Sequence, residues 1–273
     1  MRYKKILIFF LTCVAILPFV FPFYWMIKSS IESTEALFSS PTHLFPSSFT
    51  LKSYRELLSQ TDFMVYITNS ILIATGCMIL NTILSCLAGY GLTRYSFWGR
   101  KIFARGTLFA YMFPPMLLGI PFFLLFHKIG LLNTYAGIII AQATISLPFS
   151  IWLMWQFFQT VPMSYEESAW VCGASRFRTF VDVSLPLALP GIIAICLFSF
   201  ALSWSDYTFS LIILTRDSMK TLPVGLDFIM DRPSVHWGMM QAASVLVCAP
   251  GFILVLFLQR YLMAGFGVGG LKG

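Results

Sequence analysis

The sequence predicts an all-α polytopic membrane protein with six transmembrane helices in a single domain. Its 273 residues are 58% hydrophobic, 17% aromatic and only 11% charged, whereas soluble domains carry roughly a quarter charged residues. A water-soluble core would have to bury more apolar surface than a chain of this length normally does. No linker, charge block or low-complexity tract divides the chain, so one membrane domain covering residues 1–273 is expected.

Six apolar stretches are each long enough to form the helix of about 20 residues that crosses a bilayer. They cover residues 6–27, 64–92, 106–126, 135–157, 185–214 and 239–258. The first stretch follows the basic residues Arg2, Lys4 and Lys5. It is longer than the roughly 7–15 apolar residues of a cleaved signal peptide, so we interpret it as a retained anchor.

The connections between these stretches are polar or carry turn signals. Residues 28–62 contain the turn-rich string SSPTHLFPSS, and a compact basic loop follows the second stretch at residues 94–105. The third stretch is interrupted by Pro114, Pro115 and Pro121, and the fourth lies in a charge-free region. A polar loop precedes the sixth, and a glycine-rich tail ends the chain.

The charge distribution predicts that both termini are cytoplasmic. With six spans both termini lie on one side, and the segments on that side then carry 11 of the 18 Lys and Arg residues, against seven outside. An excess of positive charge on the cytoplasmic side is the usual rule. The net charge of +7 does not indicate nucleic acid, because no stripe of Lys and Arg interleaved with aromatic residues occurs.

Neither the cysteines nor the short motifs indicate catalysis. The six cysteines form no CxxC pair and no Cys/His spacing typical of a metal site, so no metal is expected. The chain has no GxxxxGK[ST] motif for nucleotide phosphates. We therefore expect no catalytic residue and no cofactor bound by this chain.

Residues 162–186 form a polar insert between apolar stretches. Ser164 and Glu167 match the S-x-x-E capping box, and acidic residues in a first helical turn complement the helix dipole. Gly173 suits the left-handed residue that ends a short helix, and Ser175 can cap a second one. The pattern predicts two short helices that meet at a bend. An ordinary polar connecting loop is the alternative.

The string EESAWVCGASRFRTFVDVSLPLALPG resembles the cytoplasmic EAA loop of ATP-binding-cassette (ABC) importer permeases. Glu167, Ser168 and Ala169 stand at the E-A-A positions, Gly173 and Ala174 match G-A, and L-P-x-x-x-P follows. Two departures occur. Serine replaces the first alanine, and cysteine replaces the aspartate that usually precedes the glycine.

Three further strings are similar to the carbohydrate, maltose-type branch of that family. They are NSILIATGCMILNTILSCLAGYGLTRYSFWGRK, SFALSWSDYTFSLIIL, in which Ser and Asp replace the family's N-E, and the closing LQRYLMAGFGVGGLKG. The resemblance therefore extends along nearly the whole chain. It implies the type I ABC importer permease fold in a prokaryotic plasma (inner) membrane, and the import of a sugar or oligosaccharide. Import of a non-sugar solute is the alternative.

The resemblance also implies partners. These are a second permease subunit, expected to be a different chain, a dimer of ATP-hydrolysing subunits that binds ATP and Mg, an extracytoplasmic substrate-binding protein, and membrane lipid. In the family, the EAA helices dock onto the ATPase. The residues assigned to ATPase coupling on this basis are Glu166, Glu167, Ala169, Gly173, Ala174 and Arg176.

Asp206 is an acidic residue inside the fifth apolar stretch, where ionisable groups are costly and default to a functional hypothesis. With Trp204 and Tyr207 beside it, it is a candidate for the substrate pathway. Capping of a broken helix explains Asp206 equally well. The lone amides Asn81 and Gln142 are explained by hydrogen bonds between helices at least as well as by ligand contact.

Two other classes of membrane protein remain as alternatives. An ion-coupled secondary transporter would use intramembrane ionisable residues, of which only Asp206 is present, and often shows inverted repeats. A membrane-embedded enzyme would cluster His, Asp or Glu at the membrane edge. Neither class explains the pattern from Glu167 to Gly173.

Overall fold

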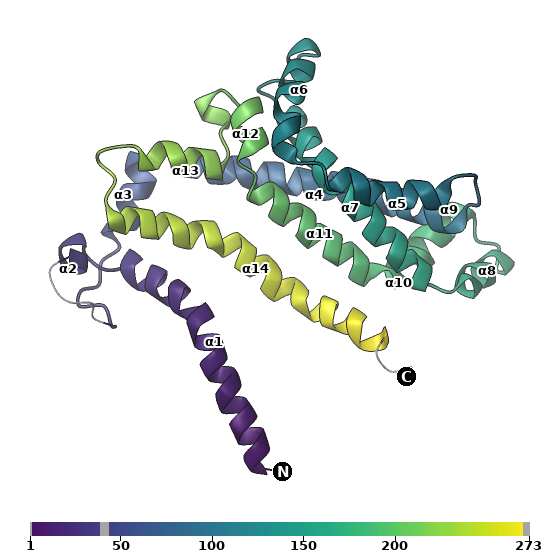
Figure 1. Cartoon of the computed structure of the whole chain (residues 1–273), viewed down its shortest axis with the longest axis horizontal. Helices are drawn as coiled ribbons and strands as arrows, with labels where there is room; N and C mark the ends of the chain where they lie inside the picture. The colour runs from purple at the N-terminus through teal and green to yellow at the C-terminus, as the bar shows by residue number, and fades with distance from the viewer. Residues whose placement is uncertain (1, 39–43, 270–273) are drawn as a thin grey trace. The chain divides into compact units, whose positions relative to one another are not determined.

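The computed structural model describes residues 2–38 and 44–269, with side chains for all of these except residues 2, 6 and 258–269. Part of the predicted turn segment and the last four residues of the glycine-rich tail therefore lie outside the described residues. Within those limits the chain contains helices and no strand, which confirms the all-α prediction (Figure 1).

The helices follow one another in a simple order. They are α1 (Arg2–Ser30), α2 (Thr34–Phe38), α3 (Lys52–Gln60), α4 (Phe63–Arg94), α5 (Arg100–Tyr111), α6 (Pro115–Lys128), α7 (Tyr135–Thr160), α8 (Met163–Val171), α9 (Arg176–Thr179), the π-helical η1 (Phe180–Ser184), α10 (Leu185–Leu187), α11 (Leu189–Trp204), α12 (Thr208–Ile213), the 3-10 helix η2 (Asp217–Met219), α13 (Leu222–Met230) and α14 (Trp237–Gly269).

Four helices among the described residues are long and apolar enough to cross a membrane, namely α1, α4, α7 and α14. Two further candidates are bent pairs. The axes of α5 and α6 meet at 96°, and the segment from Arg176 to Leu187 meets α11 at 77°. Counting each pair as one span gives six. The chain is thus a multi-pass membrane protein, and the number of six spans stays a prediction.

Proline explains the break inside the predicted third span. Pro115 occupies the first turn of α6, and Pro114 precedes it in an extended conformation. A proline inside a helix removes a backbone donor and clashes with the preceding turn. Helix α5 therefore ends at Tyr111, and the apolar run continues in a new direction as α6.

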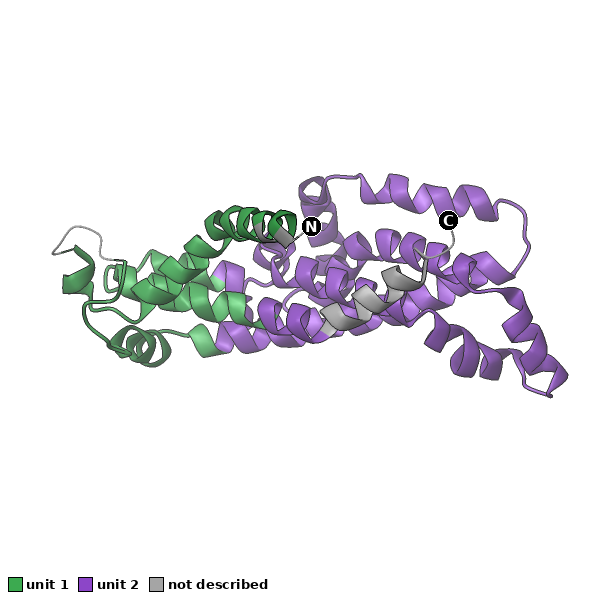
Figure 2. Cartoon of the chain, turned by 90° about the horizontal axis from the view of Figure 1, so that it is seen from below, with its two compact units in different colours: residues 1–64, 225–250 green, residues 65–224, 251–273 purple. Residues whose placement is uncertain are grey.

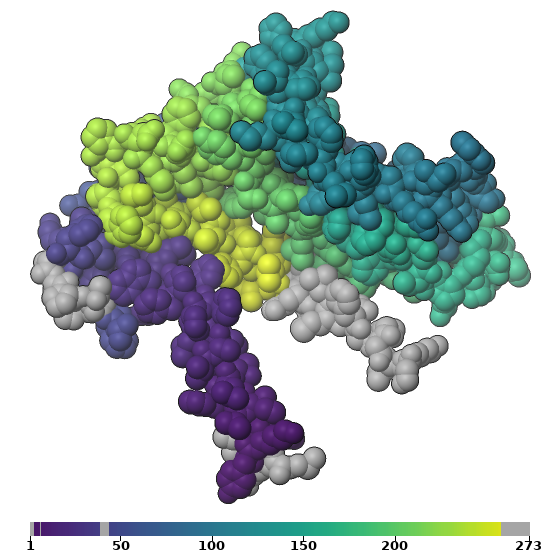
Figure 3. Space-filling view, viewed as in Figure 1, coloured from purple at the N-terminus to yellow at the C-terminus, as the bar shows by residue number. Residues whose placement is uncertain are grey.

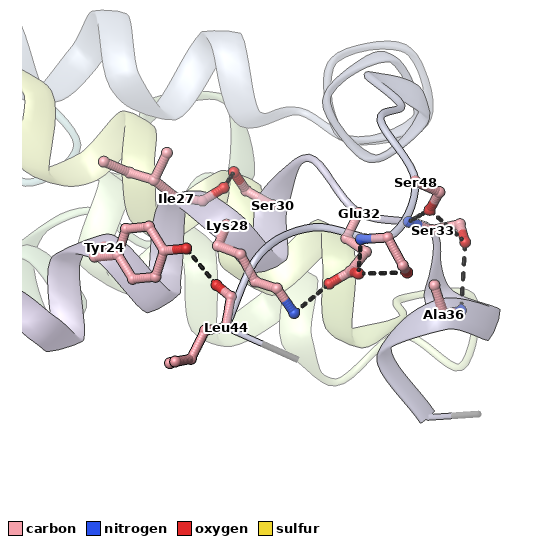
Figure 4. A network of polar contacts seen from close by, with 10 residues as sticks. Tyr24, Ile27, Lys28, Ser30, Glu32, Ser33, Ala36, Leu44 and Ser48 are labelled. Carbon is pink, nitrogen blue, oxygen red and sulfur yellow. Dashed lines mark hydrogen bonds and ion pairs between the residues drawn. The ribbon is translucent and has the colours of Figure 1, made fainter. Parts of the chain in front are cut away.

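The described chain divides into two compact units (Figure 2). Unit 1 comprises residues 1–64 and 225–250, and unit 2 comprises residues 65–224 and 251–273. In unit 1, a buried ion pair fastens the end of α1 to the following loop. Lys28 Nζ lies 2.5 Å from Glu32 Oε2 (Figure 4), and Glu32 Oε1 accepts hydrogen bonds from the backbone and hydroxyl of Ser47.

A histidine joins three segments within unit 1. His236 Nε2 lies 2.7 Å from Glu56 Oε2 of α3, and its Nδ1 lies 3.1 Å from Thr34 Oγ1 of α2. His236 immediately precedes α14. Unit 1 is therefore held by polar contacts between the loop regions as well as by apolar packing.

Unit 2 is built around α7, which packs along both α5 and α11. Two apolar clusters lie at different levels of α4 and α7. One includes Ile73, Phe126, Ile138, Phe209 and Ile213, and the other includes Tyr90, Met154, Phe158, Phe180 and Ile195.

A buried polar cluster lies between these two levels along α4 and α7. Asn81 Nδ2 donates to Ser146 Oγ of α7 and to Ser199 Oγ of α11, the latter at 3.2 Å. The sequence left two roles open for Asn81, hydrogen bonding between helices or ligand contact. The structure shows the hydrogen bonds between helices.

Candidate functional site

The insert between α7 and α11 contains two short helices that meet at Gly173. Gly173 has a φ of +86°, which is a left-handed conformation that side chains with a Cβ disfavour. Its N–H donates to the carbonyl of Trp170 at 2.9 Å, and the N–H of Ala174 donates to the carbonyl of Ala169 at 3.0 Å. These two bonds form the Schellman motif that ends a helix.

The second short helix starts immediately after the bend. Ser175 precedes α9, and its hydroxyl accepts a hydrogen bond from the N–H of Arg178 at 3.3 Å. The predicted cap at Ser175 and the predicted left-handed glycine are therefore both present. The bend is a defined turn with its backbone groups satisfied, so it differs from a loose polar loop.

A buried carboxylate anchors this segment to the helix bundle. Glu166 in the first turn of α8 is fully buried. It accepts hydrogen bonds from Tyr90 Oη at 2.9 Å, from Arg94 Nε at 2.7 Å and from Ser184 Oγ at 2.7 Å. Arg94 also donates to the carbonyl of Val161 at 2.9 Å. One carboxylate thus joins the end of α4, the start of α8 and the end of η1.

The opposite side of the same segment is exposed. Val171 is 89% exposed, Phe177 73% and Tyr165 54%, and Glu167 and Cys172 are exposed beside them. The guanidinium of Arg176 lies 3.5 Å from the ring centroid of Trp170. A cation over an indole face is favourable, and here it links the two short helices across the bend. The result is an apolar surface on a rigid support.

Asp206 lies at a break in the helix that follows. Helix α11 ends at Trp204 and α12 begins at Thr208, so residues 185–214 do not form one continuous helix. Asp206 Oδ2 accepts from the backbone N–H of Ser210 at 3.0 Å, from its hydroxyl at 2.9 Å and from Gln142 Nε2 of α7 at 2.9 Å. The geometry is that of a helix cap tied to a neighbouring helix.

The comparisons with known proteins agree on one family. Residues 81–267 match the family described as the inner membrane component of binding-protein-dependent transport systems. The chain belongs to this family.

Two relatives and one solved structure match nearly the whole length of this chain. It is 32% identical to the trehalose/maltose transport system permease protein MalG of Thermococcus litoralis, over 99% of this chain and 98% of that protein. It is 31% identical to the diacetylchitobiose uptake permease DasC of Streptomyces coelicolor, over 93% and 92% of the two chains. A bacterial ABC transporter that imports alginate contains a chain with a TM-score of 0.81 and 24% identity, covering 95% and 96%.

The structure corrects one prediction for residues 162–186, the capping box at Ser164 and Glu167. Ser164 and Glu167 do not form a capping box, because α8 begins earlier, at Met163, and Pro162 with its extended backbone is the N-cap. Ser164 lies inside the helix, where its carbonyl accepts from the hydroxyl of Ser168. Glu167 is exposed, so it does not cap the helix. Its contact with a partner remains a prediction.

The other predicted coupling residues lie on or beside the bend. Ala169 supplies a carbonyl and Ala174 an N–H to the Schellman motif. Of the predicted pathway residues, Trp204 stacks on Phe200 at a centroid distance of 5.7 Å, and Tyr207 directly precedes α12 and makes no side-chain cap bond. Their role in the pathway also stays a prediction.

Sequence reasoning missed the residues that hold the carboxylate of Glu166. Arg94 was part of the basic loop at residues 94–105, and Tyr90 lay unremarked inside the string that is similar to the maltose-type branch. Arg94 and Glu166 are 72 positions apart, so no local pattern connects them. One signal was present. No acidic residue occurs between Asp62 and Glu166, so each basic residue in that region must find any carboxylate partner far away in the sequence.

Proposed function

We propose that this permease subunit forms half of the translocation pathway for a sugar or oligosaccharide, and that the segment Met163–Ser184 couples it to an ATP-hydrolysing partner. The observation that carries the coupling is the combination of a buried anchor and an exposed apolar face on one segment. The substrate class is supported by the named sugars of the two relatives. Import of a non-sugar solute is the alternative.

The buried anchor determines how a force on the segment would reach the spanning helices. Glu166 is bonded to the end of α4 and to η1, and Arg94 is bonded to the carbonyl that ends α7. A partner that grips the exposed face would therefore move these helix ends together. ATP binding to the partner and arrival of the substrate would then bias the same two-state equilibrium, which is how coupling between sites works.

The chemistry of ATP hydrolysis, with ATP and Mg, is placed in the partner ATPase dimer. A second permease subunit completes the pathway, and an extracytoplasmic binding protein supplies the solute. The distribution of Lys and Arg supports cytoplasmic termini, and this orientation places the coupling segment on the side where ATP is available.

Reconstitution tests the proposed transport activity. The permease would be placed in liposomes with its partner permease, ATPase and binding protein, and uptake of radiolabelled trehalose, maltose, diacetylchitobiose and an amino acid would be measured. We expect uptake of at least one sugar that requires ATP. Uptake of the amino acid alone would contradict the sugar assignment, and uptake without the ATPase would contradict the coupling.

Two glycine variants separate coupling from general stability. Gly173 and Gly130 have φ values of +86° and +73°, and in both cases an added Cβ meets no atom within 4 Å. Alanine should therefore cost each about 1–2 kcal/mol of backbone strain. Gly173→Ala should lower sugar uptake per ATP hydrolysed, and Gly130→Ala should not. Equal loss in both variants would contradict the coupling role of the bend.

A further inference from the structure

A large apolar groove lies in unit 2 between α4, α5 and α7. Its volume is about 870 Å³, and its lining includes Leu84 of α4, Ile102 and Phe103 of α5, and Ile140 and Ile151 of α7. In a chain that spans a membrane, such a groove can accommodate a hydrocarbon chain or an apolar helix. The groove is distinct from the break at Asp206 and from the coupling segment.

The hydroxyl protons in the groove are already engaged in hydrogen bonds. Thr107 and Thr144 are its only lining residues with side-chain hydroxyls or other polar side-chain atoms. Thr107 donates to the carbonyl of Ala104 and Thr144 to that of Ile140, both at 2.8 Å. A sugar needs convergent polar groups for its hydroxyls, and the described lining residues offer no free side-chain donor and only two hydroxyl acceptors. An apolar occupant is therefore favoured.

The end of the groove nearest the α4–α5 loop is strongly basic. Arg100, Lys101 and Arg105 lie on the first two turns of α5, next in the chain to the lining residues Ile102, Phe103 and Gly106. No Asp or Glu occurs in the sequence between Asp62 and Glu166. The ion pairs of the described residues include Arg94 with Glu166 and none with these three cations.

An aromatic residue lies at the same end. Trp98 in the α4–α5 loop is 97% exposed, and tryptophan is enriched where the lipid headgroups begin. Figure 3 shows the atoms of α5 and α6, coloured teal, at the surface, and Ile102 and Phe103 are among the exposed residues. A basic and aromatic rim beside an apolar groove matches the two ends of a phospholipid.

The length of the groove also fits one leaflet. From Ile102 to Ala110 it follows α5 for eight residues, which is about 12 Å at 1.5 Å per residue. The hydrocarbon of one leaflet is about 15 Å thick. The basic rim lies at the end of α4 and the start of α5, so the groove extends inward from one membrane surface, and the proposed orientation makes this surface cytoplasmic.

We propose that the groove between α4, α5 and α7 binds an anionic phospholipid, with an acyl chain against Ile102, Phe103 and Ile140 and the phosphate at Arg100, Lys101 and Arg105. These three cations have no ion-pair partner among the described residues, and this bears on the choice between the two apolar occupants. An anionic headgroup at the membrane surface would neutralise these cations, and this charge complementarity favours a phospholipid over a helix of a second permease. The site does not depend on which solute is transported.

Native mass spectrometry of the purified full chain with its partner permease tests this site. The complex would be extracted from nanodiscs that contain equal amounts of phosphatidylglycerol and phosphatidylcholine, and the retained lipids would be counted. We expect the wild type to retain phosphatidylglycerol at least about tenfold over phosphatidylcholine, since each cation adds to the attraction. The preference should weaken as salt is added.

Two variants and a charge-matched control complete the design. Arg100→Gln, Lys101→Gln and Arg105→Gln together should abolish the headgroup preference, whereas Lys52→Gln, Arg55→Gln and Lys128→Gln together should not. Gly106→Leu should reduce retention of both lipids, because an added side chain there meets no protein atom within 4 Å and projects from a lining residue.

Three results would overturn the proposal. They are equal retention of the two lipids by the wild type, the same loss of preference in the charge-matched control, and efficient disulfide cross-linking of Gly106→Cys to the partner permease, which would show that protein fills the groove.

Discussion

At the scale of single residues, the two adjacent glutamates of the coupling segment have opposite environments. Glu166 is fully buried with three donors, and Glu167 is exposed. Neighbouring positions on a helix point about 100° apart, so the choice between them depends on where the helix starts. Pro162 determines that start. The sequence showed both carboxylates but not their directions, because the direction depends on packing against α4.

Substitutions at these two glutamates should differ strongly in effect. Glu166→Leu leaves Arg94 as a nearly buried cation without its partner, which typically costs about 3–5 kcal/mol. Glu167→Leu changes only an exposed position and should stay within about 0.5 kcal/mol. Thermal unfolding of the detergent-purified chain measures both. Similar melting temperatures for the two variants would mean that the buried carboxylate does not anchor the segment.

Asp206 should tolerate asparagine better than alanine. Asparagine caps helices about as well as aspartate, whereas alanine at a cap costs about 0.5–2 kcal/mol. Two quantities would be measured for Asp206→Asn and Asp206→Ala. They are the melting temperature and the concentration of sugar that gives half-maximal uptake. If Asp206→Asn keeps full stability but shifts that concentration by tenfold or more, Asp206 contacts the substrate and capping is not its main role.

The ion pair at the end of α1 should make unit 1 sensitive to acid. Burial by itself raises the pKa of Glu32, but the hydrogen bonds and charge of Lys28, with the bonds from Ser47, outweigh this effect and lower the pKa below its ordinary value of 4.5. The ionised form thus stabilises the folded state above about pH 4.5, and this contribution is lost as the pH falls through the lowered pKa.

Melting temperatures measured between pH 3 and 6 check whether ionised Glu32 stabilises the folded state. Glu32→Gln should flatten the acid dependence of the melting temperature, and Glu35→Gln at the exposed neighbouring carboxylate should leave it unchanged. An acid dependence that is the same in wild type and Glu32→Gln would show that other groups control it.

At the scale of helices, hydropathy located the apolar stretches but not their breaks. The long helices α4 and α7 cover the predicted stretches at residues 64–92 and 135–157. The stretches at 106–126 and 185–214 are divided between helices. The prolines at residues 114 and 115 predicted the break between α5 and α6. The second break follows Trp204 and is stabilised by contacts of Asp206 with another helix, and such a tertiary contact is not visible in a hydropathy pattern.

Two glycines on α4 test how closely α4 and α7 pack. A Cβ at Gly89 would lie 2.8 Å from Met154 Cβ and 2.9 Å from the α7 backbone, whereas a Cβ at Gly91 meets nothing within 4 Å. Gly89→Ala should therefore cost about 1–3 kcal/mol through overpacking. Gly91→Ala should gain up to about 1 kcal/mol from helix propensity. Unfolding measurements that rank the two variants in the opposite order would exclude close backbone packing at Gly89.

At the scale of the whole molecule, the family and the helical class were predictable, and the arrangement of charges within the fold was only partly so. The motif around Gly173 and the apolar composition were sufficient for the family. The partners of Glu166 and the position of the apolar groove depend on contacts between segments far apart in the chain. These contacts follow from packing against α7, which no single stretch of sequence specifies.

The proposed orientation can be tested with a native cysteine. Cys172 is exposed on the coupling segment, and with cytoplasmic termini it faces the cytoplasm. A membrane-impermeant maleimide should label the chain in inside-out vesicles but not in right-side-out vesicles, and Cys172→Ser should remove the label. Labelling of Cys172 from the outside of intact cells would reverse the topology and place the coupling segment away from ATP.

The separation of Arg94 from Glu166 has a consequence for synthesis of the chain. The two residues are 72 positions apart, and at about 5–20 residues per second the carboxylate is made roughly 4–14 s after the guanidinium. Helix α7 must also be inserted during this interval. The buried ion pair is therefore a late step of biogenesis, and a nascent chain stalled before α8 would present an uncompensated arginine to the insertion and quality-control machinery.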